Sequence, residues 1–139
     1  MLAVPKRPMV RVPVMGPSIC AGFPSPADDF TEDAVDIPRW MAPNPTASFL
    51  FRVDGECLID IGIFDGDLLL VDRSLKPRTG CVVVAVIDGE RSLKIIKRRH
   101  GRVHLEIANR RMPPFEVPEH ADVSIWGVAR CNIHSLLVP

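Results

Sequence analysis

The sequence of 139 residues lacks several features that indicate particular classes of protein. No apolar run approaches the ~18 residues of a transmembrane helix, and prolines interrupt the basic N-terminus where a secretory signal peptide would be continuously apolar. A net charge is also missing, because 17 basic residues balance 17 acidic ones, so no bulk attraction to nucleic acid or membrane is expected. The ordinary apolar and charged content predicts one soluble, cytoplasmic domain that does not associate with a membrane.

Closely spaced cysteine pairs are absent as well. The four cysteines, at positions 20, 57, 81 and 131, lie far apart, which predicts reduced thiols. Cys131-x-x-His134 has half the spacing of a zinc site, but no second pair accompanies it, and strand alternation would send its two side chains to opposite faces. Gly62-x-x-x-Gly66 lacks the Lys-Ser/Thr of a phosphate loop. We therefore expect no metal and no cofactor.

Proline is almost missing from the middle of the chain and concentrated near its N-terminus. Nine of the 14 prolines fall within residues 1–45, and only Pro77 interrupts residues 46–112. This distribution predicts an irregular, extended arm followed by a regular body. Its segments are an N-terminal arm (1–21), an extended linker (22–45) and a β domain (46–139).

Charge divides the arm from the linker. Residues 1–21 carry bases and no acid, whereas residues 22–36 carry five acids and no base. The sign changes at residues 20–23, Cys-Ala-Gly-Phe, where small residues sit between prolines. Such a segment can lie extended in a groove, as a protease substrate must.

The body predicts a mainly β fold of six to eight short strands. Asp88-Gly89 lies between two apolar runs and predicts a hairpin turn, whereas helical periodicity is confined to the region around 57–63. The expected strands cover 46–53, 67–72, 80–87, 91–97 and 102–108, with one or two more within 121–138.

A basic cluster follows the hairpin. It comprises Arg91, Lys94, Lys97, Arg98, Arg99, His100 and Arg102. No aromatic residue lies between these charges to stack on bases, so we interpret the cluster as a solvated turn.

Cys57 lies near the start of residues 54–72, which contain six carboxylates and no base. A helical turn directly after the cysteine would favour its thiolate, whereas the carboxylates oppose it, so thiolate formation needs a basic partner. Lys94 has apolar neighbours on either phase of strand alternation, and burial there would favour the neutral amine of a general base. From residue chemistry alone, a packing cysteine and a strand-edge lysine remain the alternative.

Four segments, in order, resemble the UmuD group of the LexA/signal-peptidase-like (S24) self-cleaving serine peptidases. Residues 20–30, CAGFPSPADDF, are similar to the family's cleavage region, and residues 54–72, DGECLIDIGIFDGDLLLVD, to its nucleophile segment. Residues 88–96, DGERSLKII, resemble the lysine strand, and residues 122–134, DVSIWGVARCNIH, the closing strand. The resemblance implies a LexA/signal-peptidase-like bent β fold with an extended N-terminal arm.

One departure affects the implied mechanism. Cys57 stands where the family has its nucleophilic serine, while Lys94 matches the general base and keeps the family's separation of 37 residues. A thiol ionises more readily than a hydroxyl, so it depends less on an amine base. The resemblance therefore implies either a working Cys57/Lys94 dyad that cleaves Ala21-Gly22 or a scaffold that has lost cleavage.

The function implied by the resemblance is that of an SOS-response accessory subunit of a translesion DNA polymerase. In that group, a RecA filament on single-stranded DNA stimulates self-cleavage, and the shortened homodimer joins a UmuC-like error-prone polymerase. The short segment before Gly22 gives no room for a DNA-binding domain, so we expect no sequence-specific DNA binding. A non-cleaving adaptor with the same partners is the main alternative, and a peptidase acting on other proteins is disfavoured by the retained Ala21-Gly22 pair.

Overall fold

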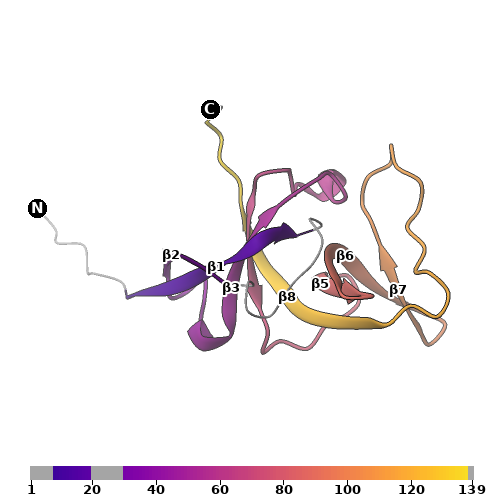
Figure 1. Ribbon diagram of the computed structural model, residues 1–139, viewed down its shortest axis with the longest axis horizontal. Coiled ribbons are helices and arrows are strands. Elements are labelled where there is room, and N and C mark those ends of the chain that lie inside the picture. Colours follow the sequence, from indigo (N-terminus) through magenta and orange to yellow (C-terminus); the bar gives the residue numbers. More distant parts are fainter. Residues whose placement is uncertain (1–7, 20–29, 138–139) are drawn as a thin grey trace, which may run out of the picture.

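The computed structural model describes residues 8–19 and 30–137, which form one eight-stranded mixed sheet (Figure 1). The strands are β1 (Met9–Ile19), β2 (Phe30–Pro38), β3 (Ser48–Val53), β4 (Leu68–Asp72), β5 (Val82–Ile87), β6 (Glu90–Arg99), β7 (Arg102–Glu106) and β8 (Val123–Ile133). The helices found in the described residues, η1 (Pro45–Ala47) and η2 (Ile59–Ile61), are single 3-10 turns, so none of them could span a membrane. The prediction of a mainly β fold is confirmed.

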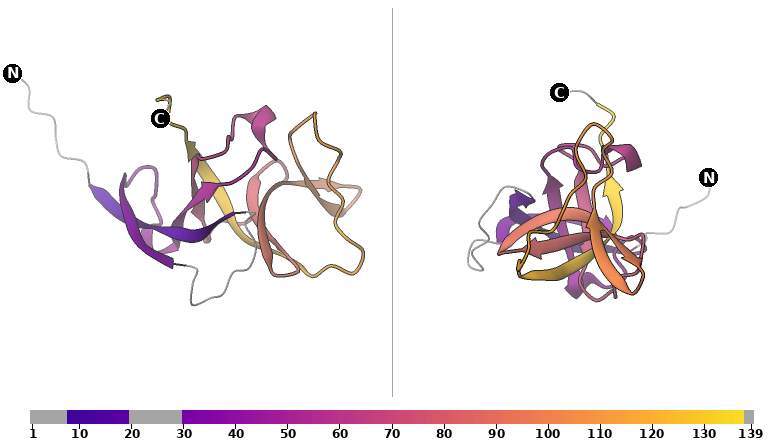
Figure 2. Two further views of the ribbon diagram at one scale, coloured as in Figure 1. Left: turned by 45° about the horizontal axis from the view of Figure 1, so that its top comes forward. Right: turned by 90° about the vertical axis from the view of Figure 1, so that its right-hand side faces the viewer.

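Strand β8 joins the two halves of the sheet. The strand order is β2-β1-β3-β4-β8-β5-β6-β7, and β8 pairs through one end with β4 and through the other with β5. Figure 1 shows β8, in yellow, curving from the β1–β4 half to the β5–β7 half, and Figure 2 shows the same bend from two other sides. Both ladders have a register shift in β8, which lets one strand serve two differently oriented neighbours.

The hairpin predicted at Asp88-Gly89 is confirmed. Both residues have positive φ, 48° and 83°, and Ile87 pairs with Glu90 across a two-residue turn. This conformation matches the twist of antiparallel strands, and Asp-Gly adopts it at low cost. The turn fixes the register of β6 and therefore which side chains share the face of Lys94.

The N-terminal arm is more regular than its prolines suggest. Residues Met9–Ile19 form β1, which lies between β2 and β3 and pairs with both. Pro13 sits at a register shift in the β1–β2 ladder, where a residue without an N–H can be accommodated. Residues 20–29, which include the predicted cleavage pair, lie outside the described residues.

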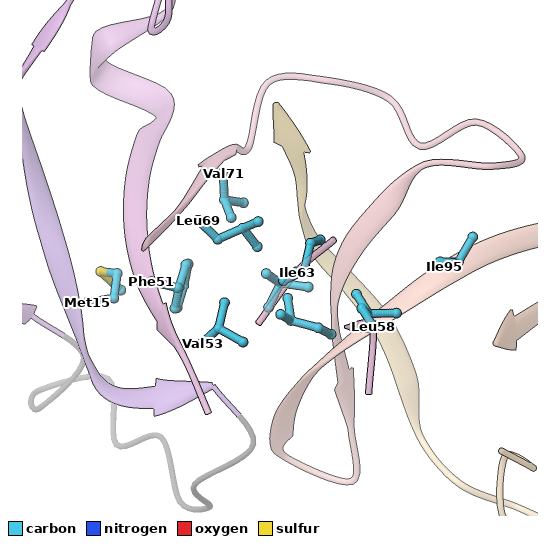
Figure 3. Packing of buried hydrophobic residues seen from close by; sticks show 10 residues of the cluster. Met15, Phe51, Val53, Leu58, Ile63, Leu69, Val71 and Ile95 are labelled. Carbon is cyan, nitrogen blue, oxygen red and sulfur yellow. The ribbon is translucent and has the colours of Figure 1, made fainter. Parts of the chain in front are cut away.

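Three apolar clusters stabilise the sheet. The largest joins the arm to the body, because Met15 of β1, which pairs with Phe51 of β3, belongs to the same cluster as Leu58 and Ile95. Figure 3 shows Met15 beside Phe51 at one end of this cluster and Ile95 at the other. A second contains Val12 with Ile37, Ala42, Leu50 and Leu70, and a third lies between β5, β6, β7 and β8. Two clusters thus include side chains from the arm.

Candidate active site

Cys57 lies in a tight turn between β3 and η2. Gly55 has a φ of +100°, a conformation that glycine adopts without the strain of a side chain, and its N–H donates to Asp65 Oδ1 at 2.8 Å. Leu58, directly after Cys57, is buried in the largest cluster. The expected helical periodicity near 57–63 is thus realised as one 3-10 turn, η2.

The segment after β7 holds the Cys57 turn from the other side. The Ala108 N–H donates to the Cys57 carbonyl at 2.8 Å, and Asn109 Nδ2 donates to the Glu56 carbonyl at 2.8 Å. The Asp60 N–H donates back to the Ala108 carbonyl at 2.8 Å. Sequence reasoning missed these contacts because two of them use only backbone atoms and all of them join segments far apart in the chain.

Lys94 is buried, as its apolar neighbours predicted. It is 5% exposed on β6, and its Nζ donates to Ser92 Oγ at 3.1 Å and to the Leu93 carbonyl at 3.2 Å. The same nitrogen lies 4.5 Å from the centroid of the Phe115 ring. Ser92 and Lys94 therefore share one face of the strand, as expected from alternation.

Adjacent residues of β6 contribute to two cavities. Leu93 lines the small cavity around Cys57, together with Asp54 and Ile63. Lys94 lines a second cavity of about 490 Å³ with Ser92 and Phe115. Neighbouring residues of a strand point to opposite faces, so Leu93 lines the Cys57 cavity from one face of β6 while Lys94 lines the cavity on the other face.

The carboxylates of residues 54–72 have structural roles that their sequence pattern did not reveal. Burial alone would raise the pKa of Asp72, but hydrogen bonds from Ser74, Asn44 and Arg130 outweigh it and lower the pKa to about 2. Burial would also raise the pKa of Asp67. Hydrogen bonds from His134, the Phe64 N–H and Asn132 outweigh it, so the pKa of Asp67 is lowered. Asp67 and Asp72, two of the six carboxylates in this segment, are therefore bound to other groups of the fold.

The two residues of Cys131-x-x-His134 have separate surroundings in the fold. His134 Nδ1 contacts Asp67 Oδ1 at 2.5 Å, whereas Cys131 packs against the second cluster, and burial raises the pKa of the Cys131 thiol despite nearby Arg130. Among the described residues, no three His, Cys, Asp or Glu side chains are grouped so as to hold a metal.

The basic cluster divides into two parts. Arg98, Arg99 and His100 are exposed at the β6–β7 turn, whereas Arg91 and Lys94 are buried. The prediction of a solvated turn therefore fails for Arg91 and Lys94, because alternation in a central strand turns both faces of β6 toward packed apolar clusters.

The end of β1 lies beside the strand that leads into the Cys57 turn. Strand β1 runs parallel to β3, and its last residue, Ile19, pairs with Val53, four residues before Cys57. Ala21 lies only two residues beyond Ile19, a span of at most ~7 Å along an extended chain. The backbone register is therefore compatible with an approach of Ala21-Gly22 to Cys57.

Comparison with known proteins gives concordant matches. The Peptidase S24-like family matches residues 13–130. Protein ImpA of Salmonella typhimurium is 40% identical over 114 residues, covering 82% of this chain and 77% of ImpA. Protein SamA of the same species (strain LT2) is 37% identical over 82% of this chain and 79% of SamA. The LexA repressor of Clostridium kluyveri is 36% identical over 82% of this chain and 56% of the repressor.

Proposed function

The chain belongs to the Peptidase S24-like family, and from that premise we propose that it is a UmuD-like, self-cleaving accessory subunit of a translesion DNA polymerase. The observation that carries the proposal is the parallel pairing of Ile19 with Val53, which directs the arm toward Cys57. The similarity to ImpA, SamA and LexA supports a role in the SOS response. In this proposal a RecA filament on single-stranded DNA stimulates cleavage in the cytoplasm.

The proposed reaction cleaves the Ala21-Gly22 bond in two steps. Cys57 Sγ, after its proton passes to the amine of Lys94, attacks the carbonyl carbon of Ala21 to form a thioester. The amine of Gly22 leaves with the proton returned by Lys94. Water then hydrolyses the thioester, giving the Ala21 carboxylate and the free Cys57 thiol.

The first experiment measures the intact mass of the full chain during incubation with activated RecA filament. We expect a product of 118 residues, 139 minus 21, whose N-terminal sequence begins at Gly22. Cys57→Ala should abolish its formation. A product that begins elsewhere would contradict the assigned bond.

Replacing Lys94 tests the base. Lys94→Ala should slow cleavage by about 10²-fold or more, the usual contribution of a general base, because the thiol loses its proton acceptor. Lys97→Ala is the control, since Lys97 carries the same amine on β6 but lines neither the Cys57 cavity nor the cavity of Lys94. Cleavage that persists unchanged near neutral pH in Lys94→Ala would show that the thiol needs no such base.

A non-cleaving adaptor is the second candidate, favoured by the cysteine at the serine position. In a variant with Cys20, Cys81 and Cys131 replaced by Ser or Ala, alkylation of Cys57 should stop cleavage if the chain is a peptidase. If the natural chain never cleaves but the Cys57→Ser variant does, the natural chain is a non-cleaving adaptor. Co-purification of a homodimer with a UmuC-like polymerase tests the partners that both candidates share.

A further inference from the structure

Arg91 is a buried arginine that takes no part in the proposed reaction. It is 4% exposed and lies on β6, three residues before Lys94 and on the same face as Leu93 and Ile95. Burying a guanidinium group is unfavourable unless packing and hydrogen bonds compensate for the lost water. Its contacts therefore indicate what the arginine is there to hold.

Those contacts connect three strands. The guanidinium carbon of Arg91 lies 5.2 Å from the centroid of the Phe51 ring in β3. Its Nη2 donates toward the Gly16 carbonyl in β1 at 3.5 Å. Gly16 is five residues before Ala21, so the contact links the lysine-bearing strand to the arm a short distance ahead of the proposed scissile bond.

The contact falls where the β-ladder does not fix the arm. Met15 pairs with Phe51, but Ile19 pairs with Val53, so four steps along β1 correspond to two steps along β3. The extra residues form a bulge that begins at Gly16, and a one-residue slip there would shift every later residue of the arm. An anchor outside the ladder is needed to keep one register.

We propose that Arg91 is a positioning residue that fixes the register of the arm and so presents Ala21-Gly22 to Cys57. This inference rests on the proposed self-cleavage. The flat guanidinium packs on Phe51 and directs an N–H at the arm, an arrangement that an aliphatic side chain of similar length cannot reproduce. Arg91 thereby couples docking of the arm to the strand that carries Lys94.

The first test compares cleavage rates in the full chain. Arg91→Met keeps the apolar stem and removes the donors, and we expect cleavage to slow at least about tenfold. Arg91→Lys retains a charged donor and should recover part of the rate. Arg73→Met is the matched control, because Arg73 also packs on an aromatic ring, Trp126, and donates to a backbone carbonyl, that of Trp126 in β8.

A second measurement separates positioning from general support of the fold. In the background with only Cys57 as thiol, Arg91→Met should leave the alkylation rate of Cys57 within about twofold of the parent. Amide hydrogen exchange is then measured in the full chain carrying Cys57→Ala, where no cleavage can occur. Arg91→Met should accelerate exchange at residues 16–19 of β1 about tenfold and leave residues 69–71 of β4 unchanged.

Each outcome decides the inference. The proposed role of Arg91 would be overturned if exchange in the arm stays unchanged or accelerates equally in the arm and in β4. It would also be overturned if the arm loosens but cleavage is unaltered. Failure of the parent chain to cleave would refute the proposed function, while the exchange data would still show whether Arg91 holds the arm.

Discussion

Asp72 is the most completely buried carboxylate of the described residues, with no exposed surface at the end of β4. It accepts hydrogen bonds from Asn44 Nδ2 and Arg130 Nε at 2.9 Å each and from Ser74 Oγ at 2.6 Å. These donors come from three separate segments, so one carboxylate ties the loop before η1 to β4 and β8. The ionised form is the form that they stabilise.

Asp72→Asn should therefore destabilise the protein by about 2 kcal/mol at pH 7, the free energy that corresponds to lowering the pKa from 3.8 to about 2. Because the folded-state pKa is the lower one, this stability is present above pH 4 and is lost as the pH falls toward 2. Urea unfolding at pH 7 and pH 3 should show the difference from the parent falling by about half. Asp36→Asn, which breaks an exposed ion pair with Arg11, should cost under about 1 kcal/mol at either pH.

Sequence separation decided which individual residues could be predicted. The burial of Lys94 followed from its immediate neighbours and strand alternation, and Cys57 was identified because its segment resembles a known one. The bonds of Asp72 to Arg130 and of Asp67 to His134 span 58 and 67 residues. A cluster of acids in a sequence contains no information about such distant partners.

Gly127 of β8 leaves no room for a side chain beside Val71 of β4. A Cβ atom added there would lie 2.6 Å from Val71 Cγ1, and Val71 is fully buried. Gly127→Ala should thus lower the free energy of unfolding by about 1–3 kcal/mol, the usual cost of overpacking. The loss should be smaller in a Val71→Ala background, which removes the clashing methyl. Additive losses in denaturant unfolding of the single and double variants would contradict this contact.

Among the strands, those joined by short connections were the predictable ones. The β5–β6 hairpin followed from Asp88-Gly89 and two apolar runs, and the other strands of the body were located to within a few residues. The arm was different, because its prolines suggested irregular structure and its partner in the sheet, β3, is about 35 residues away. Proline at a register shift leaves the ladder largely intact, which the sequence pattern does not distinguish from a loop.

For the molecule as a whole, the consequence of the proposed cleavage after Ala21 depends on where β1 lies. The strand is interior to the sheet, and its Val12 and Met15 are buried in two different apolar clusters. Each buried side chain of this size contributes about 1.5–3 kcal/mol. The cleaved arm should therefore stay bound as a separate strand until a partner or dilution displaces it, rather than leave at once.

A chain that begins at Gly22 tests this directly. It should fold, because the cluster around Val83 and Leu105 contains no arm residue, but its Tm should lie below that of the full chain.

Departure of β1 would expose the edge of β3 and the apolar side chains around Leu50, a surface suited to adding an extended strand from the proposed polymerase. A peptide of residues 8–19 should raise the Tm of this chain as its concentration rises, with the logarithm of the concentration once it exceeds the Kd. Val12→Asp in the peptide should abolish the effect, while Arg11→Ala, a change at an exposed neighbour, should preserve it. An unfolded truncated chain, or one whose Tm ignores the peptide, would show that the arm is not a displaceable strand.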